Sequence, residues 1–142
     1  MEFCPMTWIL PEQYDEFQAE REQCDNAQLY ILKPSASSCG RGIKIISKRS
    51  LISKKEGFIA SRYIMNPHIF NGYKYDLRVY VLVTSYDPLR IYVYDEGLVR
   101  FATEPYTNNQ KDLKKKFVHL TNFSVNKRSE NFVVNRGNED EG

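Results

Sequence analysis

The 142-residue chain is the size of one ordinary domain, and its 42% hydrophobic and 27% charged residues are typical of a soluble globular protein. Its longest apolar runs are five or six residues, too short to span a membrane, and no signal peptide is predicted. The three cysteines, Cys4, Cys24 and Cys39, form no C-x-x-C pair. Neither a zinc site nor a disulfide framework is therefore expected, and scattered thiols suit a reducing cytosol.

Charge is spread unevenly along the chain, although the formal net charge is only +2. Residues 1–32 carry seven acids and one base, whereas residues 33–62 carry eight bases and one acid. The second stretch predicts an anionic partner close to it, and the alternative is a basic face that is merely solvated. Nucleic acid is not the predicted partner, because the stretch lacks a stacking platform or a recognition helix.

The first predicted elements are a short helix and three strands. Residues 11–17 predict the helix, with a first-turn proline, acids near its start and two aromatic residues on one face. Residues 29–33 predict a strand that ends at the following proline, since a residue before proline favours extended geometry. A Ser/Gly-rich loop over 35–42 follows, and strands are expected at 43–47 and 58–64.

The clearest predicted element is a long strand over 73–85, which follows turns at Asn66-Pro67 and Asn71-Gly72. One of its faces is apolar and should be buried; its members are Tyr75, Leu77, Val79, Val81 and Val83. The other face carries Lys74, Asp76, Arg78 and Tyr80.

An antiparallel meander is predicted for the segment after this strand. Asp87-Pro88 turns the chain into a strand over 89–94, and a hairpin turn at 95–97 leads into a last strand over 98–103. Residues 107–116 are expected to form a mobile basic loop, and residues 135–142 a disordered polar tail.

The loop after Lys33 is the first candidate for chemistry. A lysine at a strand end, then small residues and the close pair Gly40 and Gly42, would form a flap whose amides close over phosphates. It is neither a Walker loop nor a dinucleotide fingerprint, because the required glycine and lysine spacings are missing. Taken alone, the pattern also fits a flexible hairpin loop without a ligand.

Charged residues on the long strand form the second candidate. Lys74, Asp76 and Arg78 share one face, and such a cluster is costly to cover unless each charge finds a partner. Alternatively this face is wet, or the three residues pair internally. If the following hairpin pairs with the strand, Arg100 joins the same face, where a guanidinium fork suits a carboxylate or phosphate.

Residues 119–122, His-Leu-Thr-Asn, form a third polar cluster in which the histidine is more plausibly structural than catalytic. A Ser-His-Asp triad is not supported, since no serine lies in a G-x-S-x-G elbow. From the residues alone, the function stays open.

Taken together and in order, these segments resemble the tubulin tyrosine ligase-like family over residues 5–134. The resemblance is carried by W-I-L-P (8–11), Y-I-L-K-P (30–34), G-R-G-I (40–43), Y-K-Y-D-L-R-V-Y-V-L-V-T-S (73–85), D-P-L-R-I-Y (87–92), E-G-L-V-R-F-A-T (96–103) and H-L-T-N-F-S-V-N-K (119–127). Within the family, the segments 86–92 and 117–122 are more similar to the glutamate ligases than to the tyrosine ligase. The resemblance implies an α+β, ATP-grasp-like fold: a partial domain over 1–134, dominated by an antiparallel sheet with short helices.

The resemblance also implies roles for particular residues. ATP is expected to contact Lys33, Cys39, Gly40, Ser61, Arg62, Tyr63, Ile64, Lys74, Tyr75, Asp76, Thr121 and Asn122. Among these, Lys33 would hold the phosphates, Lys74 and Asp76 would bind base and ribose, and residues 61–64 would meet the adenine, partly through backbone groups. The incoming amino acid is expected at Arg100, Phe123 and Ser124, and the catalytic charges are Arg78 and Arg100.

The implied reaction adds glutamate to glutamate side chains of tubulin tails through an acyl phosphate, with ATP and Mg²⁺ as cofactors. The implied partners are tubulin or microtubules and glutamate, with no nucleic acid and no membrane. The implied location is the cytoplasm and cytoskeleton, extending to the cilium or basal body. Two alternatives remain: a non-catalytic nucleotide- or tubulin-binding module, and a ligase for tyrosine or glycine.

Several positions depart from the family pattern. The hinge, usually Q-x-Y, is Ser61-Arg62-Tyr63 here, so an adenine contact is expected to be lost. Cys39 replaces the usual Gln or Arg, which leaves open whether the enzyme starts or extends a glutamate chain, and Phe123 replaces the usual tyrosine. The family's metal-binding acids and asparagine lie C-terminal of residue 142. No metal ligand is therefore predicted in this chain, and alone it is expected to be an incomplete catalyst.

Overall fold

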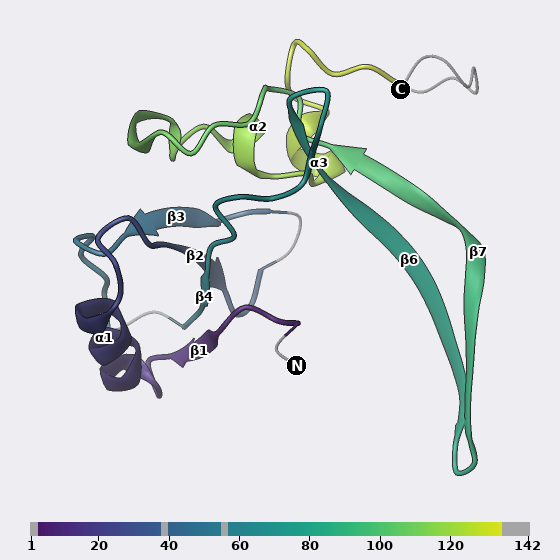
Figure 1. Ribbon diagram of the computed structural model, residues 1–142, viewed down its shortest axis with the longest axis horizontal. Coiled ribbons are helices and arrows are strands. Elements are labelled where there is room, and N and C mark those ends of the chain that lie inside the picture. Colours follow the sequence, from purple (N-terminus) through teal and green to yellow (C-terminus); the bar gives the residue numbers. More distant parts are fainter. Residues whose placement is uncertain (1–2, 38–39, 55–56, 135–142) are drawn as a thin grey trace. The chain divides into compact units, whose positions relative to one another are not determined.

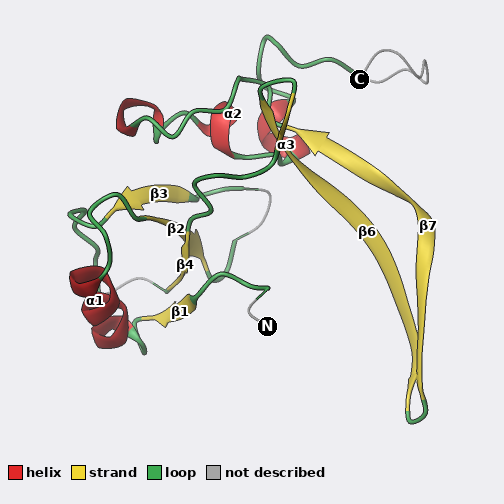
Figure 2. Ribbon diagram, in the orientation of Figure 1, coloured by secondary structure: helices red, strands yellow, loops and turns green. Residues whose placement is uncertain are grey.

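The computed structural model describes residues 3–37, 40–54 and 57–134, which fall into two compact units. The first unit is Met1–Pro67 with Thr107–Lys116, and the second is His68–Tyr106 with Phe117–Gly142. Most of the regular structure is antiparallel sheet, and the helices are few and short (Figures 1 and 2). No helix in the described ranges is long and apolar enough to cross a membrane.

The first unit is built on a four-stranded antiparallel sheet of order β1-β4-β2-β3. Its strands are β1 (Thr7–Leu10), β2 (Leu29–Pro34), β3 (Lys44–Ser47) and β4 (Phe58–Arg62). β2 and β3 flank the predicted small-residue loop, and β2 ends at Pro34. The strands predicted at 29–33, 43–47 and 58–64 are therefore confirmed, with ends shifted by one or two residues.

One face of this sheet is covered by the helix α1 (Tyr14–Gln23). The core between them consists of Trp8, Leu10, Phe17, Tyr30, Leu32, Ile46, Phe58 and Ala60. Phe17 is fully buried, and its ring centre lies 5.1 Å from those of both Trp8 and Tyr30. Offset and edge-on aromatic contacts of this kind add about 0.5–1.5 kcal/mol each beyond the area they bury.

The predicted helix at 11–17 is correct in existence but wrong in its bounds. Residues 11–13 form a turn instead, in which the Gln13 side chain accepts a hydrogen bond from the Ile9 amide at 2.8 Å and the Gln13 amide donates to the Ile9 carbonyl at 2.8 Å. The helix then continues to Gln23. Its extension was hidden in the sequence because the buried position one turn after Phe17 holds Arg21, not an apolar residue.

Arg21 and Lys48 fasten α1 to the turn after β3. The Arg21 guanidinium, 5% exposed, donates to the carbonyls of Lys48 and, at 2.6 Å, of Ser50. In the opposite direction, Lys48 Nζ donates to the carbonyls of Glu22 and Cys24 at 3.0 and 2.8 Å. A cation at this end satisfies carbonyls that the helix leaves unpaired and complements its dipole.

The second unit contains a three-stranded antiparallel sheet of order β5-β6-β7 and two single-turn helices. Its elements are β5 (Ile69–Phe70), β6 (Tyr73–Tyr86), β7 (Leu89–Phe101), α2 (Lys116–His119) and α3 (Phe123–Asn126). Asn71 and Gly72 have φ of 50° and 85°, which confirms the predicted turn before β6. In the first unit, the segment 107–116, expected as a mobile loop, includes a 3₁₀ turn, η1 (Gln110–Asp112).

The predicted hairpin turn at 95–97 is wrong, since β7 runs unbroken through it. Gly97 pairs with Val79, and a Cβ at Gly97 would lie 2.8 Å from the Arg78 carbonyl oxygen. The glycine thus permits a close approach of two strands, which is the other common reason for glycine inside a strand. β6 and β7 therefore form one long hairpin around the confirmed turn at Asp87-Pro88, not the three strands predicted over 73–103.

The expected burial of one face of β6 is also wrong. From Leu77 to Tyr86 nearly every residue is exposed on both sides of the strand, and β7 is exposed from Leu89 to Val99. Register shifts between Val79 and Val81 and between Val83 and Ser85 interrupt the alternation of faces. In Figure 1, α3 lies at the end of the hairpin away from its turn, and neither α2 nor α3 lies along the outer half of the hairpin.

Candidate functional site

Lys33 lies on the face of the first sheet that α1 does not cover. It is exposed and stands opposite Ile59 of β4, while Leu32 beside it points into the core. The same open face carries Ile9, Ile31 and Ile45 in register with their neighbours on adjoining strands. The result is an aliphatic surface with one lysine on it, a suitable environment for a flat ring next to an anion.

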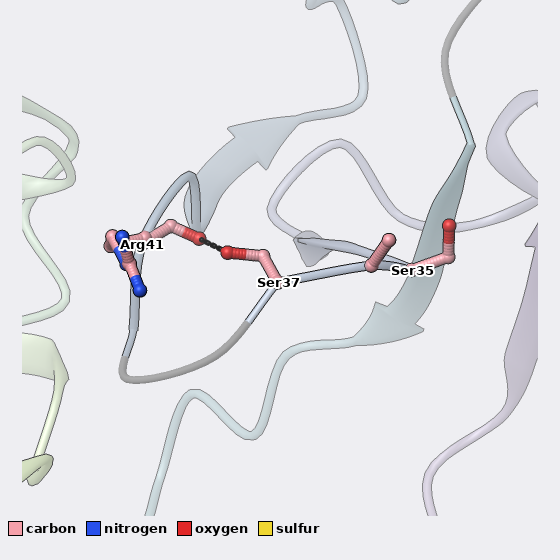
Figure 3. Close-up of a pocket in the computed structure, with 4 residues that line it drawn as sticks. Ser35, Ser37 and Arg41 are labelled. Carbon is pink, nitrogen blue, oxygen red and sulfur yellow. Dashed lines mark hydrogen bonds between the residues drawn. The ribbon is translucent and has the colours of Figure 1, made fainter.

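The loop that follows Lys33 shapes an open hollow lined by Ser35, Ala36, Ser37 and Arg41 (Figure 3). The Ser37 hydroxyl donates to the Arg41 carbonyl at 3.2 Å, which ties the two arms of the loop together. Gly40 and Gly42 adopt φ of 74° and 72°, where side chains are disfavoured. Cys39, the predicted flap residue, lies outside the described residues, whereas Gly40 is buried.

The hinge residues 61–64 divide between two faces. Ser61 is 7% exposed, and its hydroxyl lies 2.9 Å from that of Thr7 on the open face. Arg62 points toward α1, where its Nε donates to Glu20 Oε1 at 2.7 Å, so its side chain is engaged away from the open face. Tyr63 is buried and Ile64 exposed, and the Tyr63 amide donates to the Leu29 carbonyl at 2.8 Å.

Asp76 and Arg100 form the centre of the second unit's polar cluster. They stand opposite each other in the β6–β7 register. Arg100 Nε donates to Asp76 Oδ1 at 2.7 Å, Arg100 Nη2 donates to Oδ2, and the Thr121 hydroxyl donates to Oδ2 at 2.9 Å. Arg100 thus uses one edge of its fork for Asp76, and within the described part of the chain no group accepts from its Nη1.

These contacts shift the pKa values of both partners. Burial on its own would raise the pKa of Asp76, but the hydrogen bonds from Arg100 and Thr121, with the charges of Arg100 and Arg78, lower it below its ordinary value. The hydrogen bond to Asp76 raises the pKa of Arg100 further above its already high value. Both groups are therefore charged at neutral pH, as a carboxylate–guanidinium pair requires.

The other charged residues of the β6 face surround this pair. Lys74 is half-buried, with its Nζ 6.0 Å from the centre of the Tyr106 ring. Arg78 is exposed and lies two residues beyond Asp76 on the same face. Tyr75 points to the opposite face, where its hydroxyl lies 2.9 Å from His68 Nδ1. Of the predicted ligands on β6, the structure therefore gathers Lys74, Asp76 and Arg78 on one face.

The segment after α2 supplies the remaining predicted residues. Asn122 precedes α3, and Phe123 and Ser124 lie in its first turn, with Phe123 61% exposed. His119 is 3% exposed, and its ring lies 5.9 Å from that of Tyr106, in agreement with a structural role. No group of three His, Cys, Asp or Glu side chains that would hold a metal ion occurs among the residues that the structure describes.

Comparison with known proteins identifies the family. The model of the tubulin-tyrosine ligase family matches residues 1–142 of the chain. The chain belongs to this family. The resemblance read from its motifs is thereby confirmed.

Several curated relatives within the tubulin-tyrosine ligase family are glutamylases by name. Tubulin polyglutamylase TTLL5 of Mus musculus is 49% identical over 129 residues, which cover 91% of this chain and 10% of the relative. Tubulin monoglutamylase TTLL4 of Mus musculus is 44% identical over 133 residues, 94% of this chain and 11% of the relative. Tubulin polyglutamylase TTLL7 of Mus musculus is 42% identical over 144 residues, 99% of this chain and 16% of the relative. The chain thus spans about a tenth to a sixth of the length of these relatives.

Within the family motif at 119–127, one candidate functional residue was not predicted from the sequence. Asn126, 1% exposed, contacts the backbone of residues 103, 120 and 122. The only signal for it in the sequence is its spacing of four residues from Asn122, which places both on one side of a helical turn.

Proposed function

We propose that this chain forms part of an ATP-dependent ligase of ATP-grasp fold that adds glutamate to glutamate side chains of tubulin tails. The observation that carries the proposal is the Asp76–Arg100 pair, whose guanidinium keeps one edge for a ligand. A planar fork of this kind matches a carboxylate in two parallel hydrogen bonds. The choice of glutamate over tyrosine or glycine is supported by the relatives, which are named as glutamylases.

In the first unit, Lys33 is proposed to neutralise ATP phosphates, and the aliphatic open face to receive the adenine. The loop glycines would let backbone amides approach the phosphates closely. Because Arg62 is engaged with Glu20, contacts of the hinge to the base would come from backbone groups and Tyr63.

In the second unit, Lys74, Asp76, Thr121 and Asn122 are proposed to act toward the nucleotide, and Arg100, Phe123 and Ser124 toward the amino acid. Asp76 accepts hydrogen bonds and would accept others from ribose hydroxyls, while Arg78 supplies a second exposed cation for developing phosphoryl charge.

The proposed reaction has two steps. A side-chain carboxylate oxygen of the acceptor attacks the γ-phosphorus of ATP, the bond to the β-phosphate breaks, and ADP leaves. The amine of the incoming glutamate then attacks the acyl carbon, loses a proton and expels phosphate, which forms an isopeptide bond. Fixed cations such as Lys33, Arg78 and Arg100 would stabilise the charges that develop in both steps.

Basic side chains of residues 33–62 are proposed to attract the acidic tubulin tail. Arg62, Lys48 and Lys54 are engaged with Glu20, with the end of α1 and with Asp15, so the attraction would come from the other exposed cations that the structure describes in this stretch. These are Lys33, Arg41, Lys44 and Arg49. A location at the cytoskeleton follows from this partner. The described residues contain no metal-binding cluster, so none of them is proposed to hold Mg²⁺.

The test compares Lys33→Ala with Arg100→Lys in a full-length ligase that carries this chain. Lys33→Ala should lower the rate about 10²-fold or more, the usual worth of a preorganised charge at a phosphoryl group. Arg100→Lys should raise the requirement for glutamate far more than that for ATP, because lysine keeps the charge but loses the fork. The maximal rate, and the concentrations of glutamate and of ATP that give half of it, come from steady-state incorporation of labelled glutamate into microtubules.

Two results would contradict these roles. A near-normal rate in Lys33→Ala would mean that another lysine serves the phosphates. A collapse of ATP affinity in Arg100→Lys, with glutamate dependence unchanged, would make Arg100 a phosphate ligand. Lys114→Ala, which removes an exposed cation of the first unit outside residues 33–62, serves as the control for non-specific loss of charge.

A further inference from the structure

The Asn126 side chain makes four hydrogen bonds in the second unit. Its Oδ1 accepts hydrogen bonds from the amide and the hydroxyl of Thr103, each at 3.0 Å. Its Nδ2 donates to the carbonyls of Leu120 at 2.7 Å and Asn122 at 3.1 Å. A carboxamide has two donor hydrogens and two acceptor lone pairs, so every hydrogen-bonding position of this side chain is in use.

The orientation of this amide is determined by its partners. The Thr103 amide can only donate, so the atom facing it must be the oxygen of Asn126. The carbonyls of Leu120 and Asn122 can only accept, so the atom facing them must be the nitrogen. An aspartate of the same shape would place a carboxylate oxygen against two carbonyl oxygens, and only an amide satisfies the whole arrangement.

The four hydrogen bonds of Asn126 link the segment that follows Arg100 to the segment that contains Thr121. Thr103 lies three residues after Arg100 and two residues beyond the end of β7, and Leu120 and Asn122 are the two chain neighbours of Thr121. Asn126 therefore holds the backbone on each side of Thr121 at a fixed position relative to the end of β7. Thr121 in turn donates to Asp76, and Asn126 makes no bond to Asp76 or Arg100 itself.

We propose that Asn126 is a positioning residue of the Asp76–Arg100 site and acts through Thr121. The inference rests on the proposed function, because it assigns a role within the same site. Thr121 fixes one oxygen of the Asp76 carboxylate, and that oxygen also receives Arg100 Nη2. Loss of Asn126 releases the segment that carries Thr121, and the carboxylate loses its third donor. The guanidinium is then held only by a carboxylate that is free to turn.

The first test is independent of any ligand. The titration midpoint of the Asp76 side chain is followed by ¹³C NMR in the 142-residue chain and in Thr121→Val, Asn126→Ala and the double variant. Removing a donor to the charged form raises a carboxyl pKa, so Thr121→Val should shift the midpoint upward. Asn126→Ala should shift it by the same amount, and the double variant by no more than either single change.

Val118→Ala is the matched control, because it removes buried apolar surface from α2 at a 2% exposed position whose side chain makes no hydrogen bond to residues 120–122. It should lower stability and leave the Asp76 midpoint unchanged. If Asn126→Ala behaves in the same way, Asn126 is only structural and the proposal is overturned. Should Asn126→Ala fail to fold, Thr103→Val removes one of the four bonds, and an unchanged Asp76 midpoint there also counts against the proposal.

The second test separates this inference from the proposed function. ATP binding is measured by calorimetry with the same four proteins. Equal weakening in Thr121→Val, Asn126→Ala and the double variant supports both proposals. If no protein binds ATP while the Asp76 midpoint still responds to Asn126, the positioning role stands and the nucleotide role of this unit fails. If ATP binds and neither readout responds to Asn126, the positioning role fails alone.

Discussion

Asp76 receives hydrogen bonds from two segments that are distant in sequence, β7 through Arg100 and the segment before α3 through Thr121. Alternation along the strand predicted that Lys74, Asp76 and Arg78 share a face, and internal pairing among the three was one alternative. The partner that Asp76 takes is instead Arg100, which lies directly opposite in the hairpin register. Register is set by the whole β6–β7 pairing, so a local pattern cannot specify it.

The pair makes stability depend on pH. Since the pKa of Asp76 lies below its ordinary value of 3.8 in the folded chain, its contribution is fully present above pH 3.8 and is lost as pH falls toward the folded pKa. Asp76→Asn cannot titrate, so its urea midpoint should fall less than that of the wild type between about pH 6 and about pH 3. Thr84→Ala, an exposed position of β6 where neither residue titrates, is the control and should retain the wild-type slope. Equal slopes in all three proteins would contradict the role of the pair.

At the scale of an element, the sequence around Gly97 in β7 fits both a turn and a continuous strand. Asp95-Glu96-Gly97 is typical of a turn, but the strand continues because Gly97 faces the Arg78 carbonyl. Gly97→Ala should therefore lower the free energy of unfolding by about 1–3 kcal/mol, the usual cost of overpacking against a backbone that must shift.

Urea denaturation of the 142-residue chain measures this loss. Glu96→Ala, an exposed neighbour on the same strand, is the matched control and should change stability by about 0.5 kcal/mol at most. A neutral Gly97→Ala would indicate that residues 95–97 form an open turn in solution.

The docking of α1 is the second prediction at this scale. Arg21→Lys keeps a positive charge but cannot reach the carbonyls of Ser47, Lys48 and Ser50 together, so partly buried acceptors lose their donor. We expect a loss of about 1–3 kcal/mol in the free energy of unfolding. Arg49→Lys, an exposed residue in the same turn, should be nearly neutral in the same denaturation experiment. A neutral Arg21→Lys would mean that packing of Phe17 alone holds the helix.

At the scale of the whole molecule, the two units differ in how their strands are covered. β2 lies between β3 and β4 and has α1 over one face, whereas the outer half of the β6–β7 hairpin is exposed on both faces. An isolated two-stranded ribbon is marginally stable in water. Amide hydrogens of residues 79–93 should therefore exchange much faster than those of residues 29–33 and 58–62.

Hydrogen exchange with peptide-level mass spectrometry checks this expectation. Similar protection in both regions would show that another surface covers the hairpin in solution. A dilution series then shows whether that surface belongs to a second copy of the chain.

The amino-acid sequence by itself determined the properties that depend on residues adjacent in the chain. β-branched and aromatic runs located the strands at 29–33 and 73–85, proline placed the end of β2, and the ordered motifs identified the family. The tertiary structure alone decided which residue pairs with Asp76, that Arg62 turns to Glu20, and that Asn126 joins residues 103, 120 and 122. These contacts join positions far apart in sequence. They depend on strand register and on which face of each sheet is covered. Periodicity in the sequence shows only which side chains share a face.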